Sequence, residues 1–179
     1  MKPQTFALQP FAPGLPAPPY TITGTISRHQ TELSLTYHLA GRLRDLVIAP
    51  PAAVPDRQWL LWETTCFECF LAIRGAVSYW EFNLSPAGPW NVFRLASYRQ
   101  GIQEEPAFQV LPVTVSRHPE KLTLSLNVDL AATIPADRPL EVGVSAVLQH
   151  QDGRLSFWAL THPGSEPDFH NRKGFVITF

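Results

Sequence analysis

Apolar and polar residues alternate along much of this chain with a period of two, the spacing at which side chains share one face of a β-strand. In the clearest case, 122–128, leucine and valine alternate with threonine, serine and asparagine. This pattern predicts a strand with one face on a core and the other in water. Short runs bounded by Pro, Gly, Asn and Asp predict further strands over 20–27, 32–39, 90–95, 108–117 and 175–179.

The segments 141–150 and 154–160 predict a hairpin that turns at Gln151-Asp152-Gly153. No long amphipathic helix pattern interrupts the strands. The sequence therefore predicts an all-β fold, a two-sheet antiparallel β-sandwich of immunoglobulin-like or jelly-roll-like type with few or no long helices. We expect a proline-rich segment over 1–19, followed by a single domain over 20–179.

Two predicted strands in the middle of the chain, over 62–71 and 79–84, carry acids among aromatic residues. Glu68 shares one face of the first strand with Trp62, and Glu81 shares one face of the second with Tyr79 and Asn83. A carboxylate is costly to bury unless something pairs with it. These acids therefore either face water or belong to a polar site.

Charge and composition narrow the class of partner. Only 16% of the 179 residues are charged and the net charge is −1, without the dense basic run that a nucleic-acid partner requires. Proline interrupts the N-terminal residues repeatedly, and no stretch of about 20 apolar residues could span a membrane. We expect a cytosolic (cytoplasmic) protein with no nucleic-acid or membrane partner.

The two cysteines, Cys66 and Cys69, have a CxxC spacing. Residues three apart in a strand point to opposite faces, so neither a disulfide nor a shared metal is easy to form. The chain has no second cysteine pair to complete a zinc site. The spacing favours buried, unreactive thiols.

Four stretches carry a family resemblance: LWETTCFE at 61–68, YWEFNLSPAGPWN at 79–91, YRQG at 98–101 and PDFH at 167–170. Together they resemble the small standalone DOMON-like proteins, whose domain is related to type 9 carbohydrate-binding modules. The resemblance implies a two-sheet antiparallel β-sandwich that binds a sugar or a haem. A fold alone does not imply catalysis.

The haem alternative departs from the family pattern. Haem-binding DOMON domains use a methionine and a histidine as axial ligands, and the only methionine here is Met1. Ligation by two histidines stays open, but the spacing selects no pair from His29, His38, His118, His150, His162 and His170.

A saccharide site needs fixed carboxylates and amides for hydroxyl groups and aromatic faces for the C–H side of the ring. In this interpretation the acids and amide bind hydroxyls, the tyrosine and tryptophan stack, and the arginine orients the acids. The candidate ligand-binding residues are Glu68, Tyr79, Glu81, Asn83, Trp90 and Arg99. Structural roles stay open: a solvated sheet face, a tryptophan that covers the core edge, or a buried ion pair of Arg99 with one of the acids.

A second cluster, His162, Asp168 and His170, has the imidazole and carboxylate groups that a divalent metal prefers. It suggests a metal-assisted hydrolase, and the Glu68/Glu81 pair suggests a carboxylate-based one. No GxSxG, HExxH or Gly-rich phosphate loop supports catalysis. The favoured expectation is therefore a non-catalytic domain that binds a small molecule, a saccharide or sugar-like ligand, without a required cofactor. The ligand's identity and the oligomeric state stay open.

Overall fold

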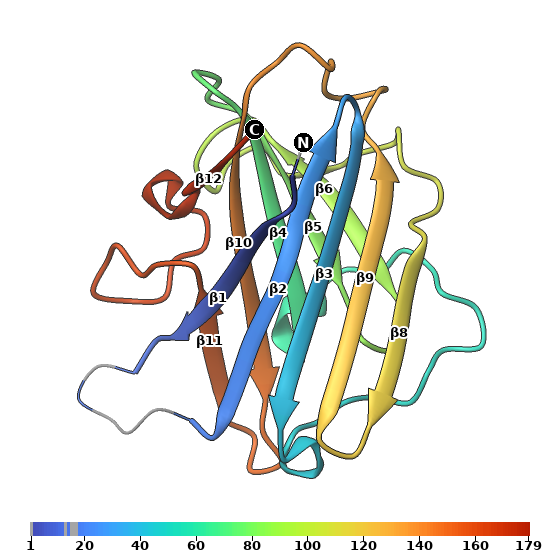
Figure 1. Ribbon diagram of the computed structural model, residues 1–179, viewed down its shortest axis with the longest axis vertical. Coiled ribbons are helices and arrows are strands. Elements are labelled where there is room, and N and C mark those ends of the chain that lie inside the picture. The colour runs from blue at the N-terminus through green and yellow to red at the C-terminus, as the bar shows by residue number, and fades with distance from the viewer. Residues whose placement is uncertain (1, 13, 15–17) are drawn as a thin grey trace.

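The structure, a computed structural model that describes residues 2–12, 14 and 18–179, consists of two antiparallel β-sheets packed face to face (Figure 1). The described residues contain no α-helix. They contain three short 3-10 turns, η1 (Leu43–Asp45), η2 (Leu61–Glu63) and η3 (Arg172–Gly174). None of these turns is long or apolar enough to cross a bilayer. The predicted all-β sandwich is confirmed.

Sheet A contains, in spatial order, β1 (Gln4–Pro10), β2 (Tyr20–His29), β3 (Glu32–Gly41), β9 (Lys121–Asp129) and β8 (Val113–His118). Sheet B contains β7 (Gln103–Glu104), β6 (Trp90–Leu95), β5 (Tyr79–Leu84), β4 (Cys66–Ile73), β10 (Leu140–Gln149) and β11 (Leu155–Ala159), and the short β12 (Ile177–Thr178) pairs with β10.

Strand β1 joins the two sheets at one edge of the sandwich. Its residues Gln4–Leu8 pair with β2, whereas Gln9 and Pro10 pair with β11. This strand lies within the proline-rich segment 1–19, where the sequence pattern predicts no strand. Residues 1, 13 and 15–17 of that segment lie outside the described part of the chain.

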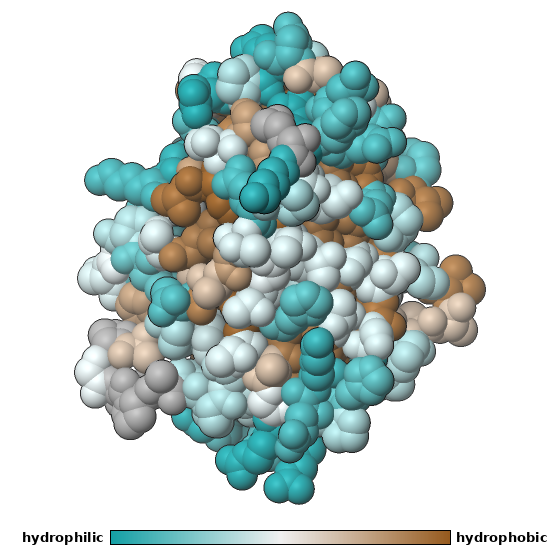
Figure 2. Space-filling model, in the orientation of Figure 1, coloured by the Kyte–Doolittle hydropathy of each residue, from teal (hydrophilic) through white to brown (hydrophobic). Residues whose placement is uncertain are grey.

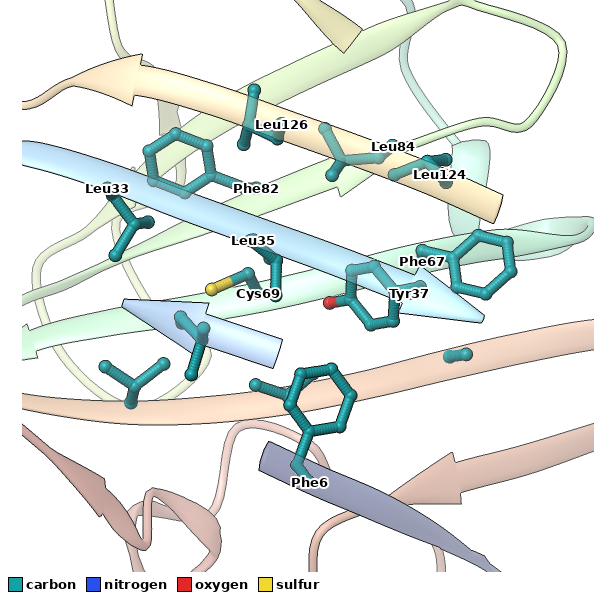
Figure 3. Close-up of a cluster of buried hydrophobic side chains, with 14 of the residues drawn as sticks. Phe6, Leu33, Leu35, Tyr37, Phe67, Cys69, Phe82, Leu84, Leu124 and Leu126 are labelled. Carbon is teal, nitrogen blue, oxygen red and sulfur yellow. The ribbon is translucent and has the colours of Figure 1, made fainter. Parts of the chain in front are cut away.

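The core lies between the two sheets, where large side chains from both inner faces interdigitate (Figure 3). Tyr37 of β3 is fully buried there, with its ring centre 5.0 Å from that of Phe67 in β4. Its hydroxyl group donates a hydrogen bond across the core to the backbone oxygen of Glu68, at 2.7 Å. This bond removes the cost of burying the hydroxyl and fixes the spacing of the sheets beneath Glu68.

The predicted strand over 122–128 and the β10–β11 hairpin are confirmed. Three predicted strands begin clearly later than expected, and the one predicted over 175–179 covers only Ile177–Thr178. The strand predicted from 108 begins only at Val113. The first central strand begins at Cys66, because Leu60 has a left-handed backbone (φ 62°) and 61–63 form a 3-10 turn. Trp62 therefore reaches the outer face of sheet B from a turn and not from the strand.

Strands β4 and β5 are buried on both faces, unlike the half-exposed strands of sheet A. Their inner residues belong to the core. Their outer residues are covered by three irregular segments: the η2 turn, the loop after β6 and the chain between β11 and β12. This second layer encloses a cavity on the outer face of sheet B, where Glu68 and Glu81 are buried.

Candidate functional site

A cavity of about 360 Å³ lies over the outer face of sheet B. The sheet contributes one residue from each of five strands: Leu95, Glu81, Glu68, Val147 and Phe157. The covering segments contribute Trp62 from η2, Arg99 and Ile102 from the loop after β6, and Pro167, Phe169 and His170 from the chain before η3.

The strand register brings the two glutamates together on this face. Glu68 pairs across β4 and β5 with Asn83, and Phe70 pairs with Glu81. Glu68 and Glu81 are therefore diagonal neighbours, a relation in which residues lie roughly 7–8 Å apart. The predicted convergence of the two acids at one cavity is present in the structure.

Both acids are buried, with 2% of Glu68 and 4% of Glu81 exposed, yet neither is fully paired. Oε2 of Glu68 accepts a hydrogen bond from the Ser145 hydroxyl at 3.3 Å, but its buried Oε1 has no partner. Oε1 of Glu81 accepts from the Asn83 amide at 2.9 Å, and its Oε2 lies 4.0 Å from Nε2 of His170, too far for a hydrogen bond. Each acid therefore keeps an oxygen for a further donor.

Burial governs the charge of these acids. It raises the pKa of Glu81 to about 7, and the hydrogen bond from Asn83 and the Arg99 charge offset part of this rise. Burial and the nearby Glu81 raise the pKa of Glu68 well above its usual value. Both acids therefore hold their protons more tightly than an exposed glutamate does, and Glu81 is close to half-ionised at neutral pH.

His170 and Tyr79 form a chain of hydrogen bonds beside Glu81. The Tyr79 hydroxyl accepts from the backbone N–H of Arg99 at 3.3 Å and shares a hydrogen bond of 2.8 Å with Nδ1 of His170. The other ring nitrogen of His170, Nε2, faces Glu81. Burial and the Arg99 charge lower the pKa of His170 to about 4, so the ring is neutral at pH 7.

Arg99 lies at the edge of the cavity, half exposed, and pairs with Asp168 and not with either glutamate. Its Nη2 donates to Oδ1 of Asp168 at 3.0 Å, and the Tyr98 hydroxyl donates to Oδ2 at 2.9 Å. Arg99 has a left-handed backbone (φ 54°), and two residues later Gly101 (φ 63°) passes so close to Ala96 that a Cβ would lie 2.8 Å from the alanine side chain. This tight loop fixes the arginine against the C-terminal segment.

Three aromatic residues that the sequence pattern does not single out as ligand platforms line the cavity: Trp62, Phe157 and Phe169. Trp62 and Phe157 look like ordinary strand or core residues in the sequence, and Phe169 lies in a loop. Only the folding of 161–176 back over sheet B brings them together. The signal nearest to them was the PDFH stretch at 167–170, which carried part of the family resemblance.

The predicted ligand-binding residues divide into three groups. Glu68, Glu81 and Arg99 line the cavity. Tyr79 and Asn83 do not line it. Both are fully buried, and each makes a hydrogen bond to a residue that lines the cavity: Tyr79 to His170 and Asn83 to Glu81. The predicted stacking role of Tyr79 therefore needs correction.

Trp90 also needs correction, because it points away from the cavity. It is the first residue of β6 and alternates with Asn91, which shares the outer face with Asn83. Trp90 is therefore buried in the core between the sheets, with the Arg57 guanidinium 4.6 Å from its ring centre. It is a structural residue on the face opposite to Glu81.

The predicted metal cluster is not assembled. His162 lies at the β1 edge, where Nε2 contacts the backbone oxygen of Gln9 at 2.8 Å and the ring packs on Phe11. Asp168 and His170 do lie together, but the aspartate carboxylate forms an ion pair with Arg99. Across residues 2–12, 14 and 18–179, no three His, Cys, Asp or Glu side chains converge in a metal-binding arrangement.

The histidines and cysteines offer no alternative chemistry at the cavity. His170 is the only one of the six histidines that lines it, so the residues present do not fit a haem with two histidine ligands. Cys66 and Cys69 are buried on opposite faces of β4, as predicted, and Cys69 lies in the core. Burial raises the pKa of both thiols.

Known structures share the fold. A proposed carbohydrate-binding protein from Bacteroides uniformis ATCC 8492 aligns with a TM-score of 0.68 and 15% identity, covering 98% of this chain and 84% of that one. A family 9 carbohydrate-binding module (CBM9) from Caldicellulosiruptor kristjanssonii in complex with cellotriose aligns with a TM-score of 0.54 and 10% identity over 90% of this chain and 74% of that one. The same kind of module in complex with glucose gives 0.50 and 10% over 88% and 76%.

These similarities establish a shared fold, since the identities are low. No family model matches the sequence, and no curated protein matches it. The structural neighbours include CBM9 modules, which agrees with the part of the sequence resemblance that points to type 9 modules.

Proposed function

We propose that this protein is a non-catalytic saccharide-binding domain of the DOMON-like type and that the ligand enters the cavity over sheet B. The observation that carries the proposal is the cavity wall, which combines two buried glutamates with free oxygens and three aromatic side chains. Sugar hydroxyls would meet the acids, and the C–H face of the ring would meet the aromatic wall.

The size and surroundings of the cavity support this proposal. A volume of about 360 Å³ suits one sugar ring or a short saccharide end, at the lower end of the usual range for ligand pockets. The neighbouring structures with the same fold include modules in complex with glucose and cellotriose. Arg99 and Asp168 at the edge form a paired, exposed border where a longer ligand would leave the cavity.

Calorimetric titration with glucose, cellobiose and cellotriose tests the proposal. We expect saturable binding to the wild-type protein and at least tenfold weaker binding to Glu81→Gln. The variant keeps the shape and the hydrogen bond from Asn83 but loses a charge-assisted bond to a sugar hydroxyl, and a tenfold change corresponds to about 1.4 kcal/mol.

Glu105→Gln is the matched control. Glu105 is also buried, but its carboxylate accepts hydrogen bonds from the Trp80 ring and the Ala107 backbone on the edge of sheet B, away from the cavity. We expect this variant to bind saccharides like the wild type. Equal weakening by both variants, or no binding of any neutral or amino saccharide by the wild type, would contradict the proposed site.

A further inference from the structure

The charge balance of the cavity bears on which saccharide it takes. Two acidic side chains line it, and the single arginine there is already paired with Asp168. Across the described ranges 2–12, 14 and 18–179, no lysine or arginine lies within 4.0 Å of Glu68 or Glu81. Within that distance the only basic group is His170, which is neutral at pH 7. Arg99 acts on the two acids only at longer range, so neither acid has a protein cation paired with it.

From this geometry we infer that the ligand carries a protonated amino group, as an amino sugar does, and that the ammonium group lies between Glu68 and Glu81. The inference rests on the proposed function and narrows it to one class of saccharide.

Each acid keeps an oxygen that such a group could use. Oε1 of Glu68 is buried without a partner, and Oε2 of Glu81 makes no hydrogen bond and lies 4.0 Å from Nε2 of His170. An ammonium group has three N–H donors and no acceptor, so it satisfies both oxygens at once. A neutral hydroxyl group has one proton and can donate to only one of them.

The aromatic wall agrees with a cationic sugar. Trp62, Phe157 and Phe169 line the same cavity as the two acids. Aromatic faces attract cations and also pack on the apolar face of a sugar ring. Acids beneath aromatic side chains thus suit a ring that carries both C–H groups and one positive charge.

Proton exchange distinguishes this ligand from a neutral sugar. Burial raises the pKa of both glutamates, so without a bound cation this pair of acids holds protons at pH 7 that exposed glutamates would have lost. One ammonium group that enters replaces one of these protons as the balancing charge, and that proton passes to the solvent. Binding of an amino sugar should therefore release protons, whereas binding of a neutral sugar should leave them in place.

The test is calorimetric titration at pH 7 with glucose, glucosamine and N-acetylglucosamine, each in two buffers with different heats of ionisation. We expect glucosamine to bind at least tenfold more tightly than the other two sugars and its heat to depend on the buffer in the sense of proton release. N-acetylglucosamine has a nitrogen at the same ring position, but this nitrogen carries no charge. Weak binding of this sugar would therefore show that the positive charge, and not the nitrogen substituent alone, is recognised.

The double variant Glu68→Gln/Glu81→Gln should bind glucosamine and glucose within about twofold of each other and release no protons, because an amide cannot balance a cation. Glu105→Gln should keep the wild-type preference. Equal affinity of the wild type for glucose and glucosamine would overturn this inference and leave the proposed saccharide site standing. Absence of binding by all three sugars, cellobiose and cellotriose would remove the proposed function as well.

Discussion

The two outer faces of this sandwich are built differently. On sheet A the outer side chains are small and hydroxylated, and Figure 2 shows them over β2, β3 and β9 as a mostly pale surface. They bond to one another across the strands, as Thr36 does to Ser125 at 3.0 Å and His38 to Thr123 at 3.1 Å. On sheet B the outer face carries aromatic residues and acids, and other segments cover it.

This difference shows what turns an outer sheet face into a site. Both faces lie outside the central core, so position alone does not decide their role. Sheet A places groups there that water satisfies at little cost. Sheet B buries Phe70, Tyr79 and Phe93 together with two acids that remain incompletely paired. Burying acids without full hydrogen bonding lowers the stability of the protein, and a ligand that donates to them offsets this loss.

The largest expected effect comes from removing an aromatic side chain that packs on the outer face of sheet B. Phe70→Ala should lower the free energy of unfolding by about 3–5 kcal/mol, because Phe70 is 1% exposed and packs on Tyr79, His170 and Phe175. In a thermal scan this corresponds to a fall in Tm on the order of 10 °C.

Thr36→Ala on sheet A is the comparison variant. It removes one half-buried hydroxyl bond and should cost about 1 kcal/mol or less. Similar losses for the two variants would mean that the covering layer over sheet B contributes no more than a solvated surface.

The next effect concerns the buried acid. Glu81 has a pKa of about 7 in the folded protein and a usual value of 4.5. Between these values the folded state holds a proton that the unfolded state has lost, so the stability of the protein falls as the pH rises from 4.5 to 7. This loss of stability amounts to about 3 kcal/mol. It is complete above pH 7 and absent below pH 4.5.

Glu81→Gln removes this titrating group. We expect the variant to be more stable than the wild type at pH 8 and nearly equal to it at pH 4, as measured by urea unfolding at both values. His170 acts in the opposite sense, because its lowered pKa of about 4 removes stability as the pH falls from 6.5 to 4, but it does so in both proteins. If Glu81→Gln is more stable than the wild type by the same amount at both pH values, ionisation of Glu81 does not destabilise the folded protein and the expected pKa shift is contradicted.

The smallest effect concerns the edge of the cavity. Asp168→Asn should cost less than about 1 kcal/mol, because Arg99 is 51% exposed and salt screens the pair. The difference in Tm from the wild type should shrink further in high salt. Asp152→Asn, at the fully exposed pair with Arg154, provides the comparison. A loss of several kcal/mol at Asp168 alone would identify it as an anchor of the covering segment.

Particular residues show how far the sequence could predict the site. Glu68 and Glu81 line one cavity, as the hypothesis of a polar site requires. A period of two fixes side-chain direction within each strand, whereas the pairing of β4 with β5 puts the two acids on the same face. Trp90 was placed wrongly, although its strand was predicted with the right bounds, because alternation does not say which face of a strand packs on the core. A shift of one residue moves a side chain to the other face of the sheet.

The sequence by itself determined the alternation of faces, the strand-rich sandwich and the presence of acids on the outer face of β4 and β5. Only the tertiary structure decided that η2, the loop after β6 and 161–176 close over these acids, and that His162 stays far from His170's cavity at the β1 edge. The physical reason is the distance along the sequence between the residues that interact. Face alternation is a local property of the backbone, whereas a cavity arises from packing between segments far apart in the sequence.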